Sequence, residues 1–257
     1  MSRLSEIFIK SEKCFIPFVT AGHPDLDSTR EIILGLVKAG SHIVEIGIPF
    51  SDPIADGPVI QQSSFQSLKH QYSFADYIEL VRQLRRHTDA GLIFMTYVNP
   101  VLSYGLQKLD EEGSRAGLDG ILVSDLIPEE YARLEPIKGL DTIFLAAPTS
   151  SDERLEKIAA ASRGFVYLVA RTGVTGGQSD VEDLVPKTVS RLRRCSQLPI
   201  AVGFGITSFR DVRKVWQYAD GAVVGSAIVR FIEENRSVKN LGERVEEWVR
   251  KDLIPIA

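Results

Sequence analysis

Two carboxylates in one short stretch of the sequence lie in surroundings suited to acid–base chemistry. Glu45 lies between Val44 and Ile46 in an apolar run, and Asp56 follows in a loop rich in proline and glycine. A carboxylate among apolar side chains loses hydration, and this loss raises its pKa. A carboxyl group with a pKa near neutrality can donate a proton and take it back, so Glu45 is a candidate general acid and base.

The direction of the Glu45 side chain depends on the strand that carries it. Because strand side chains alternate between two faces, Glu45 points away from the apolar face formed by Val44 and Ile46. In a barrel the apolar outer face packs on helices, which would direct Glu45 inward. Alternatively, Glu45 bends out to solvent at the end of the strand. Asp56 has an alternative of its own, since loop aspartates commonly accept backbone N–H groups in turns.

Two glycine-containing segments could bind an anion. The segments are VGFGI (202–206) and VGSAIV (224–229), and they end the last two apolar runs of the chain. Glycine allows a phosphate to approach the backbone closely, and Ser226 could add a hydroxyl. In parallel barrels a phosphate commonly binds the loops after the seventh and eighth strands, so the pair favours a phosphorylated substrate.

Other chemistries find little support in the sequence. The histidines share no metal-ligand spacing; they are His23, His42, His70 and His87. Cys14 and Cys195 have no paired spacing, which predicts free thiols in a reducing compartment. The net charge of -4 argues against nucleic-acid binding, and no apolar run approaches the roughly 18 residues of a membrane span. The N-terminal segment is too polar for a secretory signal, so we expect a cytoplasmic protein.

The elements that position these residues follow a repeating order. Short apolar runs alternate about eight times with helical patterns, which predicts a parallel sheet. The apolar runs are residues 14–20, 42–49, 92–98, 120–125, 142–148, 165–170, 199–205 and 221–227. The helical patterns include residues 27–40, 74–87, 151–162, 181–194 and 208–219.

At 257 residues without a linker, the best fit is α/β: a single-domain (β/α)8 TIM barrel over residues 1–257, with an extra N-terminal helix at 1–10. A doubly wound open sheet is the alternative. Two connections, 49–56 and 171–180, exceed the usual length of roughly 2–6 residues, which is typical of active-site loops.

The motifs together resemble the tryptophan synthase alpha subunit family. The resemblance rests on FVTAGHPD, VEIGIPFSDPIADGP, SRGFVYLVARTGVTG, VGFGI and VVGSAIV, in this order and over nearly the whole chain. It implies retro-aldol cleavage of indole-3-glycerol phosphate to indole and glyceraldehyde 3-phosphate. Glu45 would be the proton shuttle, and Asp56 would remain ionised and accept the indole N–H. The resemblance thus implies a lyase with two catalytic carboxylates.

The resemblance also implies a set of substrate-binding residues. Tyr167 would line the pocket near Glu45. Thr175 and Gly176 would belong to a closing lid. The phosphate would be held by Gly176 of the lid and by Gly205, Gly225 and Ser226 of the glycine-containing segments, and Phe204 would also bind the substrate. Three further residues would line the indole pocket, although barrel core explains them equally well: Phe18, Tyr97 and Leu122.

The family further implies a beta-subunit partner that carries pyridoxal phosphate, in an alpha2beta2 heterotetramer, and no cofactor or metal in this chain. Pro53 and the segment 95–105 would face that partner. A regulatory subunit with weak turnover is an alternative. Another phosphate-binding barrel enzyme would typically use a strand lysine, and the apolar runs contain none. Ser124, Thr96 and the lid segment 176–181 depart from the family pattern.

Overall fold

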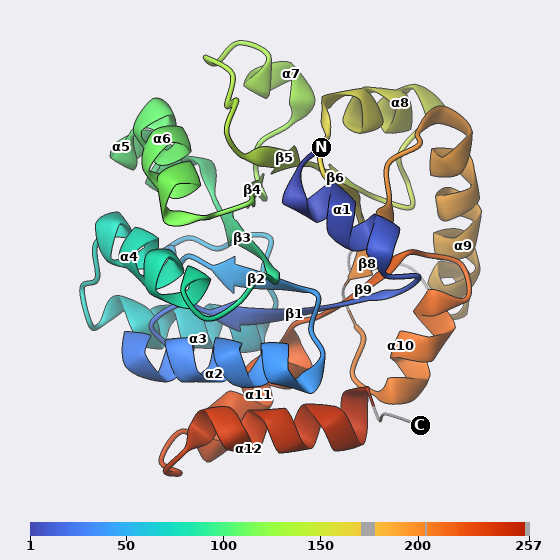
Figure 1. Ribbon diagram of the computed structural model, residues 1–257. Helices are drawn as coiled ribbons and strands as arrows, with labels where there is room; N and C mark the ends of the chain where they lie inside the picture. The colour runs from blue at the N-terminus through green and yellow to red at the C-terminus, as the bar shows by residue number, and fades with distance from the viewer. Residues whose placement is uncertain (171–177, 204, 255–257) are drawn as a thin grey trace.

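Parallel strands form the centre of the molecule (Figure 1). The structure is a computed structural model that describes residues 1–170, 178–203 and 205–254. The strands are β1 Cys14–Thr20, β2 Ile43–Gly47, β3 Gly91–Thr96, β4 Gly120–Val123, β5 Asp141–Ile143, β6 Leu145–Ala146, β7 Val166–Val169, β8 Ile200–Gly203 and β9 Gly221–Val224. Their order in the sheet is β5-β4-β3-β2-β1-β9-β8-β7-β6, and every pairing is parallel.

The two edges of this sheet meet in one segment of the chain. β5 and β6 are separated only by Phe144, and β5 pairs with β4 whereas β6 pairs with β7. Ile143 and Leu145 both pack with the barrel interior, and Phe144 packs with the outer core, so side-chain alternation continues through the break. The segment is therefore one strand position that changes partner, and eight positions close the barrel.

Helices surround the barrel and cover one of its ends. They are α1 Arg3–Lys10, α2 Leu26–Ala39, α3 Pro58–Leu68, α4 Phe74–Arg85, α5 Val98–Tyr104, α6 Leu106–Ala116, α7 Pro128–Tyr131, α8 Asp152–Ala161, α9 Gln178–Cys195, α10 Phe209–Trp216, α11 Ser226–Asn235 and α12 Leu241–Trp248, followed by the π-helical turn Val249–Leu253. α1 lies across the end where the strands begin, which faces the viewer in Figure 1. Leu4 and Ile7 of α1 pack there beside Gly91, the first residue of β3.

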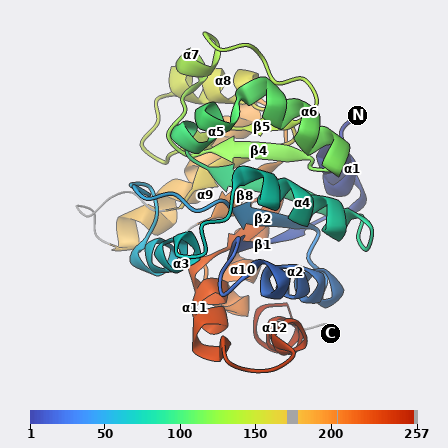
Figure 2. The same cartoon turned by 90° about the vertical axis from the view of Figure 1, so that its left-hand side faces the viewer.

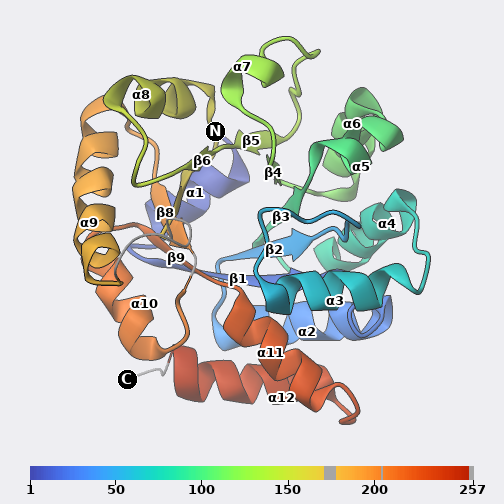
Figure 3. The same ribbon diagram turned by 180° about the vertical axis from the view of Figure 1, so that it is seen from behind.

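The apolar residues form two separate cores. The inner core fills the barrel and includes Ile16, Ile43 and Ile93. The outer core lies between the strands and the helices and includes Val44 and Ile46. This division confirms the predicted TIM barrel and excludes the open sheet. The remaining open end of the barrel faces the viewer in Figure 3, where α3 and α11 lie side by side.

Several predicted boundaries differ from those of the structure, and two of the differences have a local cause. The apolar run 92–98 ends as a strand at Thr96, and α5 begins at Val98 because the Asp125 carboxylate accepts the Val98 N–H at 2.7 Å. The predicted connection 171–180 includes the first turn of α9, which begins at Gln178. Polar residues are common in a first helical turn, since its N–H groups have no partner within the helix.

The last helix of the chain is held against the first long one. α12 packs beside α2 and lies below it in Figure 2. Cys14 and Cys195 are free thiols, as predicted. Within the three described ranges, no helix is both long and apolar enough to cross a membrane.

Candidate active site

Glu45 lies on the inner face of β2. It is fully buried, and its strand neighbours Val44 and Ile46 belong to the outer core. In the ladder it is level with Phe18 of β1 and Ile93 of β3, both in the inner core. The structure therefore places the carboxyl group inside the barrel, and the alternative of a solvent-exposed Glu45 is wrong.

The Glu45 carboxyl group has no compensating partner in the described part of the chain. Neither of its oxygens has a hydrogen-bond partner there. Burial raises the pKa of Glu45 from its usual value to about 8, because the charged form loses its hydration. The side chain is therefore mostly protonated at neutral pH, in the state of an acid ready to donate.

Asp56 lies at the open end of the barrel and is tied to Tyr97. The Tyr97 hydroxyl accepts the Ala55 N–H at 3.1 Å and is hydrogen-bonded to the Asp56 side chain. Burial raises the pKa of Asp56 to about 6, and the bond to Tyr97 opposes that rise. Asp56 is therefore mostly ionised at neutral pH, in the opposite state from Glu45.

Tyr167 lies close to both carboxylates. Burial, followed by the charges of Glu45 and Asp56, raises its pKa well above the usual value. Its hydroxyl lies over Gly203 at the end of β8, where a built Cβ would be 2.0 Å from the hydroxyl oxygen. Only glycine leaves room for the tyrosine in this position.

Phe18 packs in the same way over Gly47, where a Cβ would be 2.3 Å from the ring. Phe18, Asp56 and Tyr97 line one pocket at the open end of the barrel, whereas Glu45 and Tyr167 are not among its lining residues. The other lining residues are Gly47, Ile48, Ile60, Ser64, Met95, Thr96 and Ser124. Leu122 is buried in the inner core but does not line this pocket.

Sequence reasoning missed the part of the lining that comes from α3. Ile60 and Ser64 lie four residues apart, on one face of that helix. Pro58 marks the start of the helix, and the spacing of Ile60 and Ser64 was the available signal.

Of the described candidate phosphate residues, Gly225 lies beside two residues that line the pocket. Gly225 directly precedes α11. A Cβ built on Gly225 would lie 3.6 Å from the nearest atom of Phe18 and 3.7 Å from that of Ile60. Ser226 is the first residue of α11, so free helix N–H groups are available beside it. Gly205 has a φ of +81°, with nothing within 4 Å of a Cβ. Thr175, Gly176 and Phe204 lie outside the described residues.

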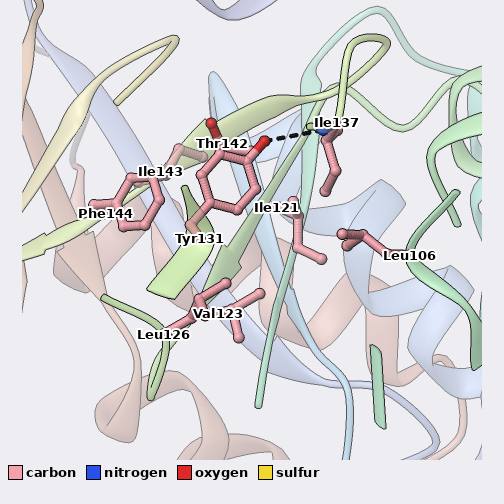
Figure 4. A pocket seen from close by; sticks show the side chains of 9 residues that line it. All are labelled: Leu106, Ile121, Val123, Leu126, Tyr131, Ile137, Thr142, Ile143 and Phe144. Carbon is pink, nitrogen blue, oxygen red and sulfur yellow. Dashed lines mark hydrogen bonds between the residues drawn. The ribbon is translucent and has the colours of Figure 1, made fainter. Parts of the chain in front are cut away.

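Among the described residues there is no cluster of three His, Cys, Asp or Glu side chains that could hold a metal ion. A second pocket is lined by residues of the paired strands β4 and β5 and by Tyr131 of the short helix α7 (Figure 4). Its lining is almost entirely apolar: Leu106, Ile121, Val123, Leu126, Tyr131, Ile137, Thr142, Ile143 and Phe144. None of the predicted site residues lies there.

Known proteins with a similar sequence share one description. The family model described as tryptophan synthase alpha chain matches residues 4–253. The tryptophan synthase alpha chain of Solibacter usitatus (strain Ellin6076) is 42% identical over 258 residues, which cover 98% of this chain and 97% of the relative. That of Geobacter sulfurreducens is 42% identical over 256 residues and 97% of each chain.

Solved structures agree with the sequence relatives. The tryptophan synthase A-subunit of the hyperthermophile Pyrococcus furiosus is similar with a TM-score of 0.85 and 36% identity, over 96% of this chain and 99% of that one. A chain of tryptophan synthase from M. tuberculosis, in an aminoacrylate-bound form, has a TM-score of 0.84 and 32% identity, over 96% of this chain and 98% of that chain. With the fold and near-complete coverage in agreement, the chain belongs to the tryptophan synthase alpha chain family.

Proposed function

We propose that the chain cleaves indole-3-glycerol phosphate to indole and glyceraldehyde 3-phosphate, with Glu45 and Asp56 as its catalytic residues. The observation that carries the proposal is the buried Glu45 carboxyl group, unpartnered within the described residues and with a pKa raised to about 8. Asp56, with a pKa of about 6, supplies an anion at the same end of the barrel.

The first step is a proton transfer to the ring. Protonated Glu45 donates its proton to carbon 3 of the indole, which makes the ring nitrogen electron-poor. The Asp56 carboxylate accepts the indole N–H and stabilises the positive charge that develops there. Because Tyr97 holds the Asp56 side chain, the anion is already positioned before the charge develops.

The second step breaks the carbon–carbon bond. Glu45, now a carboxylate, takes the proton of the substrate hydroxyl on the carbon attached to the ring. The bond between that carbon and carbon 3 breaks, its electron pair returns to the ring, and the carbon becomes an aldehyde. Glu45 is protonated again at the end, so no oxidant, reductant or further reactant is needed.

The remaining residues bind the substrate in this proposal. Phe18 and Tyr97 form the ring pocket, with Leu122 and Tyr167 behind them in the inner core. The phosphate binds at the N-terminus of α11, where free N–H groups favour an anion. Its contacts come from Gly205, Gly225 and Ser226, together with Gly176 and Phe204. Thr175 belongs to the closing lid.

The family implies a beta-subunit partner. We place the chain in a cytoplasmic alpha2beta2 heterotetramer in which the partner carries pyridoxal phosphate and uses the indole for L-tryptophan synthesis. Exposed apolar side chains at the open end of the barrel support a contact there. Ile54, Leu102 and Ile127 are 83%, 50% and 43% exposed and follow β2, β3 and β4.

The substitution Glu45→Gln tests the proposed reaction. Glutamine has nearly the same shape but carries no transferable proton, so we expect indole release to fall by roughly 10²–10⁴-fold. Asp141→Asn is the matched control, because Asp141 is also buried but starts β5 at the other end of the barrel. Indole release at the unmodified rate in the Glu45→Gln protein would overturn the proton shuttle.

The same assay separates the enzyme from a purely regulatory subunit. Indole release is measured with and without the beta subunit, for the unmodified chain and for Glu45→Gln. If the chain is a lyase, Glu45→Gln abolishes indole release both with and without the beta subunit, and the variant still binds the partner. A regulatory subunit would keep its full effect on the partner and show no release that depends on Glu45.

A further inference from the structure

An unpaired hydroxyl group lies in the wall of the ring pocket. Ser124 directly follows β4, and its N–H donates to the Thr96 carbonyl at 2.8 Å, which extends the ladder by one residue. Leu122, two residues earlier, belongs to the inner core, so the Ser124 side chain faces the barrel interior. Ser124 lines the same pocket as Asp56 and Tyr97.

The Ser124 hydroxyl is buried and has no hydrogen-bond partner among the described residues. Buried polar groups usually have a partner, because an unsatisfied one keeps the full cost of lost hydration. A hydroxyl can donate one hydrogen bond and accept others, so Ser124 can pair with either kind of group. Its position in the pocket wall means that such a group can come from a bound molecule.

The indole ring cannot satisfy this hydroxyl by itself. Indole carries a single N–H, and the proposed function, on which this inference rests, pairs that N–H with Asp56. The other ring edges are carbon and hydrogen. With unsubstituted indole bound, Ser124 therefore depends on a trapped water molecule or stays unpaired.

We propose that Ser124 is a specificity-determining residue, which makes the pocket favour indole rings that carry a hydroxyl or amino group on the benzene ring. Such a group supplies the hydrogen-bond partner that the plain ring lacks. A site that offers a hydrogen bond discriminates against ligands that leave it unmade. Ser124 does not touch the reacting atoms, so its effect is on ring selection.

Binding of matched ligands tests this assignment. The probes are indole-3-propanol phosphate and its four derivatives with a hydroxyl group at ring position 4, 5, 6 or 7. Their Kd values are measured by calorimetry with the unmodified chain, with Ser124→Ala and with Ser41→Ala. Ser41 is the matched control, since its hydroxyl is also buried and unpartnered among the described residues, but it precedes β2 at the far end of the barrel.

We expect Ser124→Ala to raise the Kd of at least one hydroxylated ligand by about five- to tenfold relative to the Kd of the plain ligand. This change corresponds to the loss of one neutral hydrogen bond. The plain ligand should bind the alanine variant more tightly, because a methyl group then faces the ring. Ser41→Ala should leave unchanged the ratio of the Kd of each hydroxylated ligand to the Kd of the plain ligand. If no ratio changes by more than about twofold with Ser124→Ala, or if Ser41→Ala changes the same ratios, the specificity role is wrong although the proposed function survives. Failure of the plain ligand to bind the unmodified chain overturns both.

Discussion

At the scale of single residues, the two carboxylates are held in opposite charge states. Burial raises the pKa of Glu45 to about 8 and that of Asp56 to about 6. The reactive form needs Glu45 protonated and Asp56 ionised, and this form predominates between the two values. We expect a bell-shaped pH profile of kcat/KM for indole release with a maximum at about pH 7. Activity falls below pH 6 as Asp56 gains a proton, and above pH 8 as Glu45 loses one.

The substitution Tyr97→Phe identifies which limb of the pH profile of kcat/KM reports the titration of Asp56. The Tyr97 hydroxyl lowers the pKa of Asp56, so its removal should shift the acidic limb to higher pH and leave the alkaline limb in place. Tyr104→Phe is the control, since the Tyr104 hydroxyl donates to Glu112, outside the site. An acidic limb that stays fixed in Tyr97→Phe would contradict this assignment.

Single-residue features differ in how far the sequence predicts them. Strand alternation directs Glu45 away from its apolar neighbours Val44 and Ile46, but the structure was needed to decide between the barrel interior and solvent. The bond between Asp56 and Tyr97 joins loops after two different strands, so no local spacing encodes it. The unpaired hydroxyl of Ser124 is likewise visible only once its neighbours are known.

At the scale of elements, α2 and α12 approach each other through a pair of glycines. A Cβ built on Gly35 would be 2.2 Å from the carbonyl oxygen of Gly242, and one on Gly242 would be 2.4 Å from that of Glu31. Backbone atoms cannot rotate out of the way as a side chain can. We therefore expect Gly35→Ala to force the helices apart and to lower the free energy of unfolding by roughly 1–3 kcal/mol, measured by urea denaturation.

Gly57→Ala is the control for that substitution. Gly57 precedes α3 with a φ of -76°, and nothing lies within 4 Å of a Cβ built on it. The urea midpoint of Gly57→Ala should stay close to that of the unmodified chain. An unchanged midpoint in Gly35→Ala would mean that the helices are not held at this crossing.

Element boundaries were predictable where the pattern is local. β1 matches the predicted apolar run at both ends, because Lys13 directly precedes it and a turn at Ala21 and Gly22 directly follows it. The break between β5 and β6 was not predictable, since it reflects a change of strand partner while alternation continues. The start of α5 depends on Asp125, a residue far along the chain, which local periodicity does not reach.

At the scale of the whole molecule, the two ends of the barrel have different roles. α1 packs against the strand starts, where Leu4 and Ile7 lie beside Gly91. The site residues lie at the strand ends, and so do the exposed apolar residues Ile54, Leu102 and Ile127. A partner bound over that open end would receive indole without its release to solvent, which is the arrangement that the proposed heterotetramer requires.

Leu102→Asp tests the position of the partner. Leu102 is 50% exposed on α5, and a charge placed there would lose its hydration in an apolar interface. We expect the Kd for the beta subunit, measured by calorimetry, to rise by about tenfold or more. Ile9→Asp is the matched control, because Ile9 is 69% exposed on α1 at the opposite end of the barrel. Equal losses in both variants, or a loss in Ile9→Asp alone, would place the partner elsewhere, whereas a loss in Leu102→Asp alone locates it at the end where indole is formed.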